Sequence, residues 1–174
     1  MITPIIILLL LTGPMLIAGL LGRRQPQGQH PVQPSAQSLA LVRQQQAFWG
    51  LSLAFIFFAI GHGVETQGMV AMLPPWLPMR LELVYATGLL ELVIAAGLLI
   101  PRFRIRTAQL AIGVFVIFFP ANIYAAMHQV GLGGHQWGPV YLLIRAPLQC
   151  ILIAWAYYFC LKPIPVREKR KHSY

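Results

Sequence analysis

Residues 81–100 read LELVYATGLLELVIAAGLLI, a twenty-residue stretch that is apolar apart from Glu82, Tyr85, Thr87 and Glu91. A run of about 20 predominantly apolar residues is long enough to cross the hydrocarbon core of a bilayer as a helix. Irregular backbone cannot face lipid, so we expect a transmembrane helix here. Glu91 stands near its middle, where an ionised side chain needs a partner inside the protein.

Four other segments are long and apolar enough to span a membrane, and they are residues 4–22, 47–64, 107–127 and 140–161. Of the 174 residues, 57% are hydrophobic and only 10% are charged. Soluble domains average roughly 45–50% and about 25%. This composition argues against a soluble enzyme and against a disordered chain. We predict an all-α membrane protein, a four-helix transmembrane bundle preceded by one extra N-terminal transmembrane helix.

The sequence predicts four consecutive regions. They are an N-terminal transmembrane anchor (1–22), a Gln- and Pro-rich cytoplasmic linker (23–46), a four-span bundle (47–162) and a basic cytoplasmic tail (163–174). The linker contains eight Gln and three Pro and has no helical periodicity, which is typical of a solvated segment. Basic residues follow the first apolar run instead of preceding it, which favours an uncleaved anchor over a signal peptide.

The 13 Lys and Arg outnumber the 4 Asp and Glu, giving a net charge of +9. The basic residues form short clusters between apolar runs and no single patch, so we expect no nucleic-acid partner. Arg80 is the only one in the loops 65–80 and 128–139, and nearly all others flank the opposite ends of the spans. Because Lys and Arg accumulate on the cytoplasmic side, we expect a bacterial inner-membrane protein with its N-terminus outside and its C-terminus in the cytoplasm.

Five polar side chains fall in the outer halves of the predicted spans, and they are His62, Glu91, Asn122, Arg145 and Gln149. A charged side chain at mid-span costs about 2.5–3.5 kcal/mol, so we expect the five to converge and Arg145 to reach toward Glu91. Glu82, half a turn out of phase with Glu91, should face elsewhere.

Prolines indicate where these side chains meet. Pro120 and Pro147 each remove a helical hydrogen bond beside Asn122 or Arg145, which predicts a cavity at this level. The proline-rich loop Met69–Leu77 should lie at the outer interface and cap it.

Two interpretations of this cluster stay open. It can be a ligand or proton site, or it can simply fix the packing of the helices. His62, Glu65, His128 and His135 raise the question of a metal site, but they lack the spacing of known ligand sets and we predict none.

The stretch from about Phe48 to Phe159 resembles the DoxX-like family of small bacterial membrane proteins. The motifs are Gly61-His62, Met72-Leu73-Pro74-Pro75-Trp76-Leu77-Pro78, Glu91, Phe119-Pro120-Ala121-Asn122-Ile123-Tyr124 and Arg145-Ala146-Pro147-Leu148-Gln149. The resemblance implies a four-helix transmembrane bundle, to which this chain adds a first span. Relatives include a small subunit of thiosulfate:quinone oxidoreductase and, more distantly, receptor assembly chaperones of animals.

This resemblance suggests a redox-associated membrane subunit with an outward-opening polar pocket for a quinone or another small ligand. His62, Glu91, Asn122, Arg145 and Gln149 would then be the ligand-binding residues. The alternative is a non-catalytic assembly or interaction protein whose buried polar cluster is structural. Quinone is the one cofactor that we consider, the partners expected are the lipid bilayer and other membrane subunits, and the sequence leaves open whether the protein is an enzyme.

Overall fold

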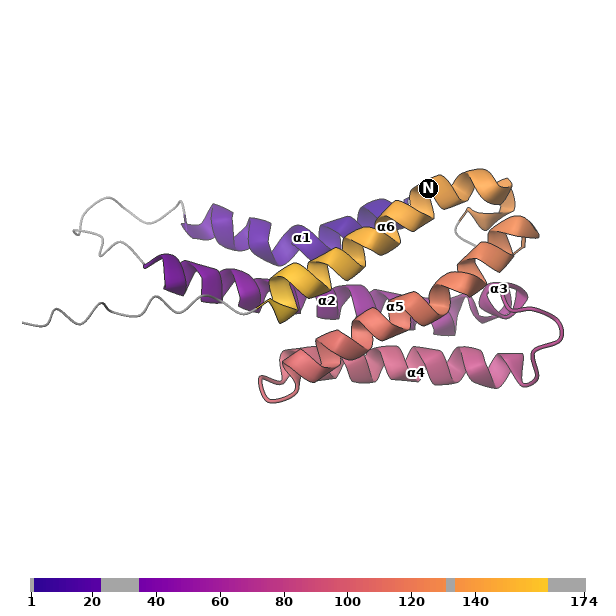
Figure 1. The fold of residues 1–174 in the computed structure, drawn as a ribbon, viewed down its shortest axis with the longest axis horizontal. Helices are drawn as coiled ribbons and strands as arrows, with labels where there is room; N and C mark the ends of the chain where they lie inside the picture. The colour runs from indigo at the N-terminus through magenta and orange to yellow at the C-terminus, as the bar shows by residue number, and fades with distance from the viewer. Residues whose placement is uncertain (1, 23–34, 131–133, 163–174) are drawn as a thin grey trace, which may run out of the picture.

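The computed structural model describes residues 2–22, 35–130 and 134–162, and in this part of the chain the regular secondary structure consists of helices joined by turns and loops, with no strand. The helices are α1 (Thr3–Gly22), α2 (Ala36–Val64), α3 (Thr66–Ala71), α4 (Arg80–Leu99), α5 (Arg104–Met127), the 3-10 helix η1 (His135–Tyr141), α6 (Leu142–Trp155) and the π-helix η2 (Ala156–Leu161) (Figure 1). Within these residues, 5 helical stretches are long and apolar enough to cross a membrane. The prediction of an all-α membrane protein with an extra N-terminal helix is confirmed.

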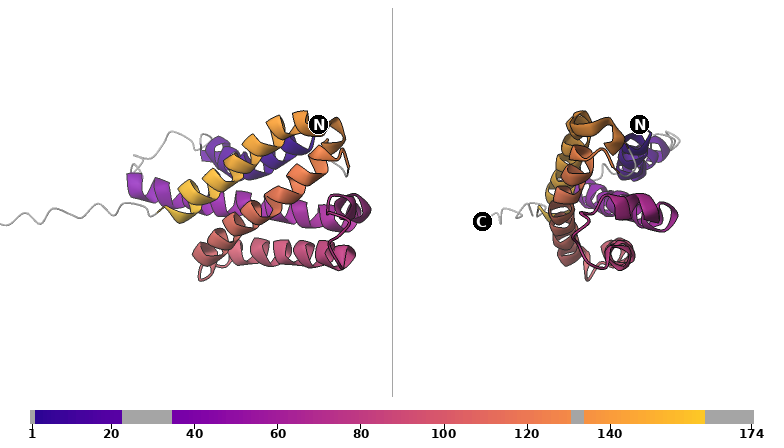
Figure 2. Two further views of the ribbon diagram at one scale, coloured as in Figure 1. Left: turned by 45° about the vertical axis from the view of Figure 1, so that its right-hand side comes forward. Right: turned by 90° about the vertical axis from the view of Figure 1, so that its right-hand side faces the viewer.

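The helices form two layers. α1, α2 and α4 lie side by side with α2 in the middle, and α5 and α6 cross this layer obliquely (Figures 1 and 2). α5 meets α4 near the turn that joins them and diverges from it toward the end where α3 lies (Figure 1). The layers are therefore closest at one end of the bundle.

Apolar side chains fill the space between the layers in the middle of the bundle. Phe55 of α2 stacks on Phe115 of α5 with ring centroids 5.0 Å apart, and Ile94 and Leu98 of α4 are fully buried. The Ser52 hydroxyl donates a hydrogen bond to the Ala95 carbonyl at 2.9 Å, joining α2 to α4. This core places the polar residues of the spans nearer the α3 end.

The predicted linker 23–46 is wrong in its second half, because α2 begins at Ala36. Ser35 caps the helix, its side-chain oxygen accepting a hydrogen bond from the Ser38 backbone at 3.1 Å. Gln, Leu, Ala and Arg, which dominate the next turns, all favour helix. Residues 23–34 and the predicted tail 163–174 lie outside the described residues.

α1 is not a separate anchor, because it packs into the bundle. Its Ile7 and Leu11 are fully buried. A Cβ atom added to Gly50 of α2 would lie 2.0 Å from the Leu11 carbonyl oxygen. The two backbones thus touch at Gly50, a small-residue contact typical of helix packing in membranes.

Basic residues gather at the end of the bundle away from α3. Arg104, at the start of α5, donates hydrogen bonds to the Leu98 and Leu99 carbonyls at 3.2 and 3.3 Å. It therefore satisfies the last carbonyl groups of α4. It also donates to the side chain of Gln45, and its guanidinium lies 5.2 Å from the centre of the Phe48 ring. One arginine thus ties α2, α4 and α5 together at this end.

Gly50→Leu should separate α1 from α2, because the new side chain would occupy the position of the Leu11 carbonyl. We expect a loss of about 1–3 kcal/mol or more in stability, measured as a lower melting temperature in detergent. Gly19→Leu is the matched control, since a Cβ there meets nothing within 4 Å. Equal melting of the two variants would contradict the close contact.

Candidate functional site

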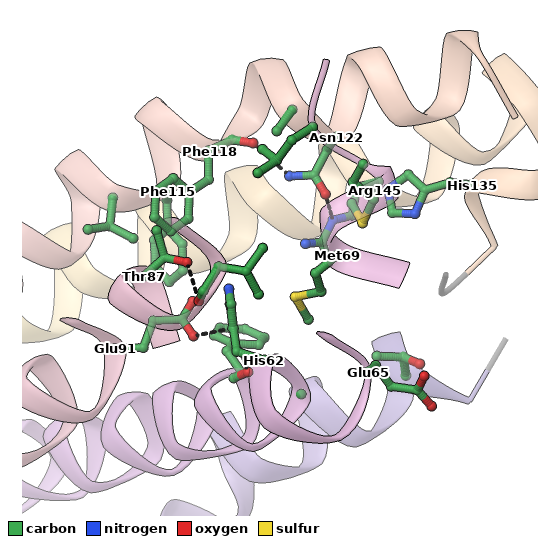
Figure 3. A pocket seen from close by; sticks show the side chains of 18 of the residues that line it. His62, Glu65, Met69, Thr87, Glu91, Phe115, Phe118, Asn122, His135 and Arg145 are labelled. Carbon is green, nitrogen blue, oxygen red and sulfur yellow. Dashed lines mark hydrogen bonds and ion pairs between the residues drawn. The ribbon is translucent and has the colours of Figure 1, made fainter. Parts of the chain in front are cut away.

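A cavity of about 670 Å³ lies between the two layers at the α3 end of the bundle, and all five predicted polar residues line it (Figure 3). Most of the remaining wall is apolar, with Phe57 and Phe58 of α2 and Phe115 and Phe118 of α5. Ligand sites are typically apolar clefts of about 300–1,000 Å³ with a few converging polar groups. The predicted convergence and the predicted cavity beside the two prolines are confirmed.

The first polar cluster joins α2 to α4 through His62 and Glu91. The His62 Nδ1 atom lies 3.0 Å from the Glu91 Oε2 atom and 3.0 Å from the Phe58 carbonyl oxygen. The Phe58 carbonyl oxygen can only accept a hydrogen bond, so Nδ1 carries the proton, and Nε2 is left for other partners. We call His62 and Glu91 the acid–imidazole pair.

Gly88 allows this pair to form. It stands one turn before Glu91 on α4, and a Cβ atom there would lie 2.8 Å from the His62 Cβ atom. Any larger residue would move the imidazole away from α4. The distance between the two helices, and with it the contact between His62 and Glu91, therefore depends on the absence of a side chain at Gly88.

The second cluster joins α6 to α5 through Arg145 and Asn122. Arg145 donates a hydrogen bond from Nε to the Asn122 Oδ1 atom at 3.0 Å. The amide nitrogen of Asn122 donates in turn to the Phe118 carbonyl at 2.9 Å, which fixes the orientation of the amide. The guanidinium extends from α6 toward the His62 side of the cavity (Figure 3). We call these two residues the arginine–amide pair.

The expected pairing of Arg145 with Glu91 is wrong, because the ion pair of Glu91 is with His62. α2 lies beside α4 in the same layer, so His62 reaches the carboxylate directly. Arg145, on α6, belongs to the opposite layer, across the cavity (Figure 3).

Gln149 lies one turn after Arg145 and is buried with 7% of its surface exposed. Its amide nitrogen donates to the Phe115 carbonyl of α5. Two side-chain amides, Asn122 and Gln149, therefore bond to α5 carbonyls on the turns just before Pro120. The Gln149 bond ties α6 to α5 at the level of the cavity, whereas the Asn122 bond lies within α5.

Loops enclose the cavity at the α3 end of the bundle. Met69 of α3 lines it, as do Met72, Leu73 and Leu77 after α3, which confirms that the proline-rich segment is its cap. Glu82 is exposed and lies outside the cavity, as its phase predicts.

His135 and Tyr141 belong to the cavity wall, although from the sequence we placed His135 in the loop 128–139 and Tyr141 at the start of the last span and assigned neither to the polar site. Both are buried, and their rings meet edge to face with centroids 4.9 Å apart. Gly134 and Gly138 have positive φ angles of 106° and 73°, which turn the chain back over the cavity. A Cβ at Gly134 would lie 2.5 Å from the Tyr141 ring. These glycines are the sequence signal that could have revealed the wall.

The residues considered as metal ligands do not form one group. His128 is exposed and stacks on Tyr124 at 4.0 Å between ring centroids, and it does not line the cavity that His62, Glu65 and His135 share. Within residues 2–22, 35–130 and 134–162, no three His, Cys, Asp or Glu side chains are placed to hold a metal ion.

Asn122→Ala should destabilise the protein by about 1–3 kcal/mol, because it leaves the half-buried Arg145 Nε–H without its acceptor. Thermal unfolding in detergent measures the loss. Gln109→Ala, at an exposed position of the same helix, is the control and should change little. Asn122→Asp keeps an acceptor oxygen and should recover part of the stability. Identical melting of Asn122→Ala and Gln109→Ala would disprove the role of the amide.

A family model described as a domain of unknown function (DUF8561) matches residues 51–160. The matched segment begins within α2, ends within η2 and includes all five predicted polar residues. No curated protein and no solved structure matches the chain.

Proposed function

We propose that this chain, which belongs to the DUF8561 family, is a redox-associated membrane subunit whose cavity binds a quinone head group. The observation that carries the proposal is the placement of two hydrogen-bonding clusters on opposite sides of one apolar cavity. The acid–imidazole pair lies on the α2–α4 side and the arginine–amide pair on the α5–α6 side. Such a site suits a flat apolar ligand with a polar group at each end.

A quinone ring has this form, because its two carbonyl oxygens lie on opposite sides of the ring. The Arg145 guanidinium would donate to one oxygen. The Nε2 atom of His62 would bond to the other oxygen, accepting from a quinol hydroxyl when the imidazole is neutral and donating to a quinone oxygen when it is protonated. Reduction of a quinone by an electron-donating partner subunit also requires protons, and Glu91 beside His62 is placed to exchange one.

The resemblance to the DoxX-like family supports this proposal, since relatives of that family include a subunit of a quinone-dependent enzyme. We place the protein in a bacterial inner membrane with its N-terminus outside. The basic end with Arg104 would then face the cytoplasm, and the α3 end would face outward.

The alternative function is that of an assembly or interaction protein without a ligand. A specific observation favours it: Arg145 and Gln149 of α6 donate hydrogen bonds to the Asn122 side chain and to the Phe115 carbonyl of α5. Such bonds fix helix positions whether or not a ligand is present. In this case the polar clusters specify the bundle, and its surface contacts another membrane subunit.

Quinone binding tests the proposal directly. Protein purified in detergent from bacterial membranes should contain quinone, detected by solvent extraction and chromatography. Arg145→Gln should weaken quinone binding about tenfold or more, because it removes a charge-assisted hydrogen bond. The control is Arg106→Gln, because Arg106 is exposed and lies near the start of α5, at the end of the bundle away from the cavity. The proposal fails if no quinone is bound and quinone-dependent respiration is unchanged in a deletion strain.

Glu91→Gln separates proton exchange from packing. The amide has nearly the shape of the carboxylate but does not exchange a proton at neutral pH. We expect normal membrane abundance and a loss of quinone-dependent respiration in cells that carry this variant. Glu82→Gln, at an exposed position of the same helix, should behave as wild type. Lower abundance alone, with respiration unchanged per molecule, would favour the structural alternative.

A further inference from the structure

Two residues that line the cavity are also exposed on the outside of the bundle. Leu83 of α4 has 38% of its surface exposed and Ile117 of α5 has 71%, and both belong to the cavity wall. A residue can do both only where the cavity reaches the surface. The cavity therefore opens beside these two side chains, between α4 and α5.

The course of the helices explains this opening. Near the turn that joins them, α4 and α5 are in close contact, since a Cβ at Gly97 would lie 2.6 Å from the Thr107 hydroxyl oxygen. From there the two helices diverge toward the α3 end (Figures 1 and 2). The opening lies where they are apart, and it is built into the tilt of α5.

On the α5 side, the opening reaches well into the membrane-spanning part of the helix. Ile117 stands ten residues before the end of α5 at Met127, or about 15 Å along the helix axis. Leu83 lies in the first turn of α4, so the opening extends from the end of this span down to the depth of Ile117. An opening at this depth borders acyl chains more than water.

A continuous path leads from the opening to the polar clusters. On α4, Leu83, Thr87 and Glu91 follow one another at four-residue intervals and all line the cavity. On α5, Val114, Ile117 and Ala121 form the facing stripe. An elongated ligand lying between these stripes would have its polar end near the acid–imidazole pair and its apolar end among the lipids.

We infer that the ligand reaches the cavity laterally, from the bilayer, through the opening between Leu83 and Ile117, and that it carries a long apolar chain. The inference rests on the proposed function for the head group and narrows it to a chain-bearing quinone. The chain would remain in the opening while the head contacts Arg145 and His62.

The cavity also reaches the surface beside Ile60 and Val64, which are 56% and 73% exposed. Val64 is the last residue of α2, so this second opening lies at the end of a span, near the level of the membrane surface. It would suit a ligand that arrives from water. The two routes predict different effects of chain length.

The experiment compares two quinones, decyl-benzoquinone and tetramethyl-p-benzoquinone, which lacks a chain. Both are titrated against protein reconstituted in phosphatidylcholine vesicles. Ile117→Trp fills the opening and should weaken binding of the decyl compound about tenfold or more. Binding of the chainless compound should stay within about twofold of wild type. Val116→Trp is the matched control, since Val116 is also exposed, with 56% of its surface, but lies outside this cavity.

The outcomes distinguish this inference from the proposed function. If wild-type protein binds neither quinone, the proposed function fails. If Ile117→Trp binds both as wild type does, or weakens both equally, the lateral route is overturned while quinone binding stands. If Val64→Trp weakens binding of the decyl compound and Ile117→Trp does not, the route is assigned to the other opening. Leu83→Trp enters the same opening from α4 and repeats the test if Ile117→Trp does not insert.

Discussion

The structure depends on the burial of one carboxylate in an apolar helix. Glu91 has 4% of its surface exposed and lies where lipid would surround an isolated span, so a partner on a neighbouring helix is required. His62 is that partner, at 3.0 Å. The contact brings α2 against α4, and Gly88 is needed because only hydrogen fits between the helices at that point. The pairing thus fixes which helices are neighbours as well as where the charge lies.

The position of α5 follows from contacts with different helices at its two ends. At one end α5 is held to α4 and α2 by Arg104, which bonds to the Leu98 carbonyl and to Gln45. At the other end its partner is α6, through Arg145 and Asn122. A helix held to different neighbours at its two ends must cross the bundle obliquely. The cavity is the space that this tilt leaves, and the arginine–amide pair faces the acid–imidazole pair across it.

The sequence predicts the spans and the membership of the polar site, because both follow from one-dimensional patterns. Length and hydropathy define a transmembrane helix, and a polar residue inside it must face the protein. It does not predict which polar residue pairs with which, since that depends on the order of helices around the bundle. Arg145 and Glu91 were expected to attract each other by charge, but they belong to different layers. The sequence does not predict the packing of α1 against α2 for a related reason. Gly50 resembles any other glycine until the helix opposite it is known.

The polar chemistry and the enclosure of the cavity come from different parts of the chain. The segment 51–160 that matches the family model contains both polar pairs and Gln149. Thr3 and Ile7 of α1, which also line the cavity, lie outside that segment. α1 holds its place by backbone contact with Gly50 and not by any polar bond to the two pairs. A change in α1 would therefore alter the shape of the cavity and leave its hydrogen-bonding groups in place. The hydrogen-bonding groups of the cavity and its shape can therefore vary independently in this architecture.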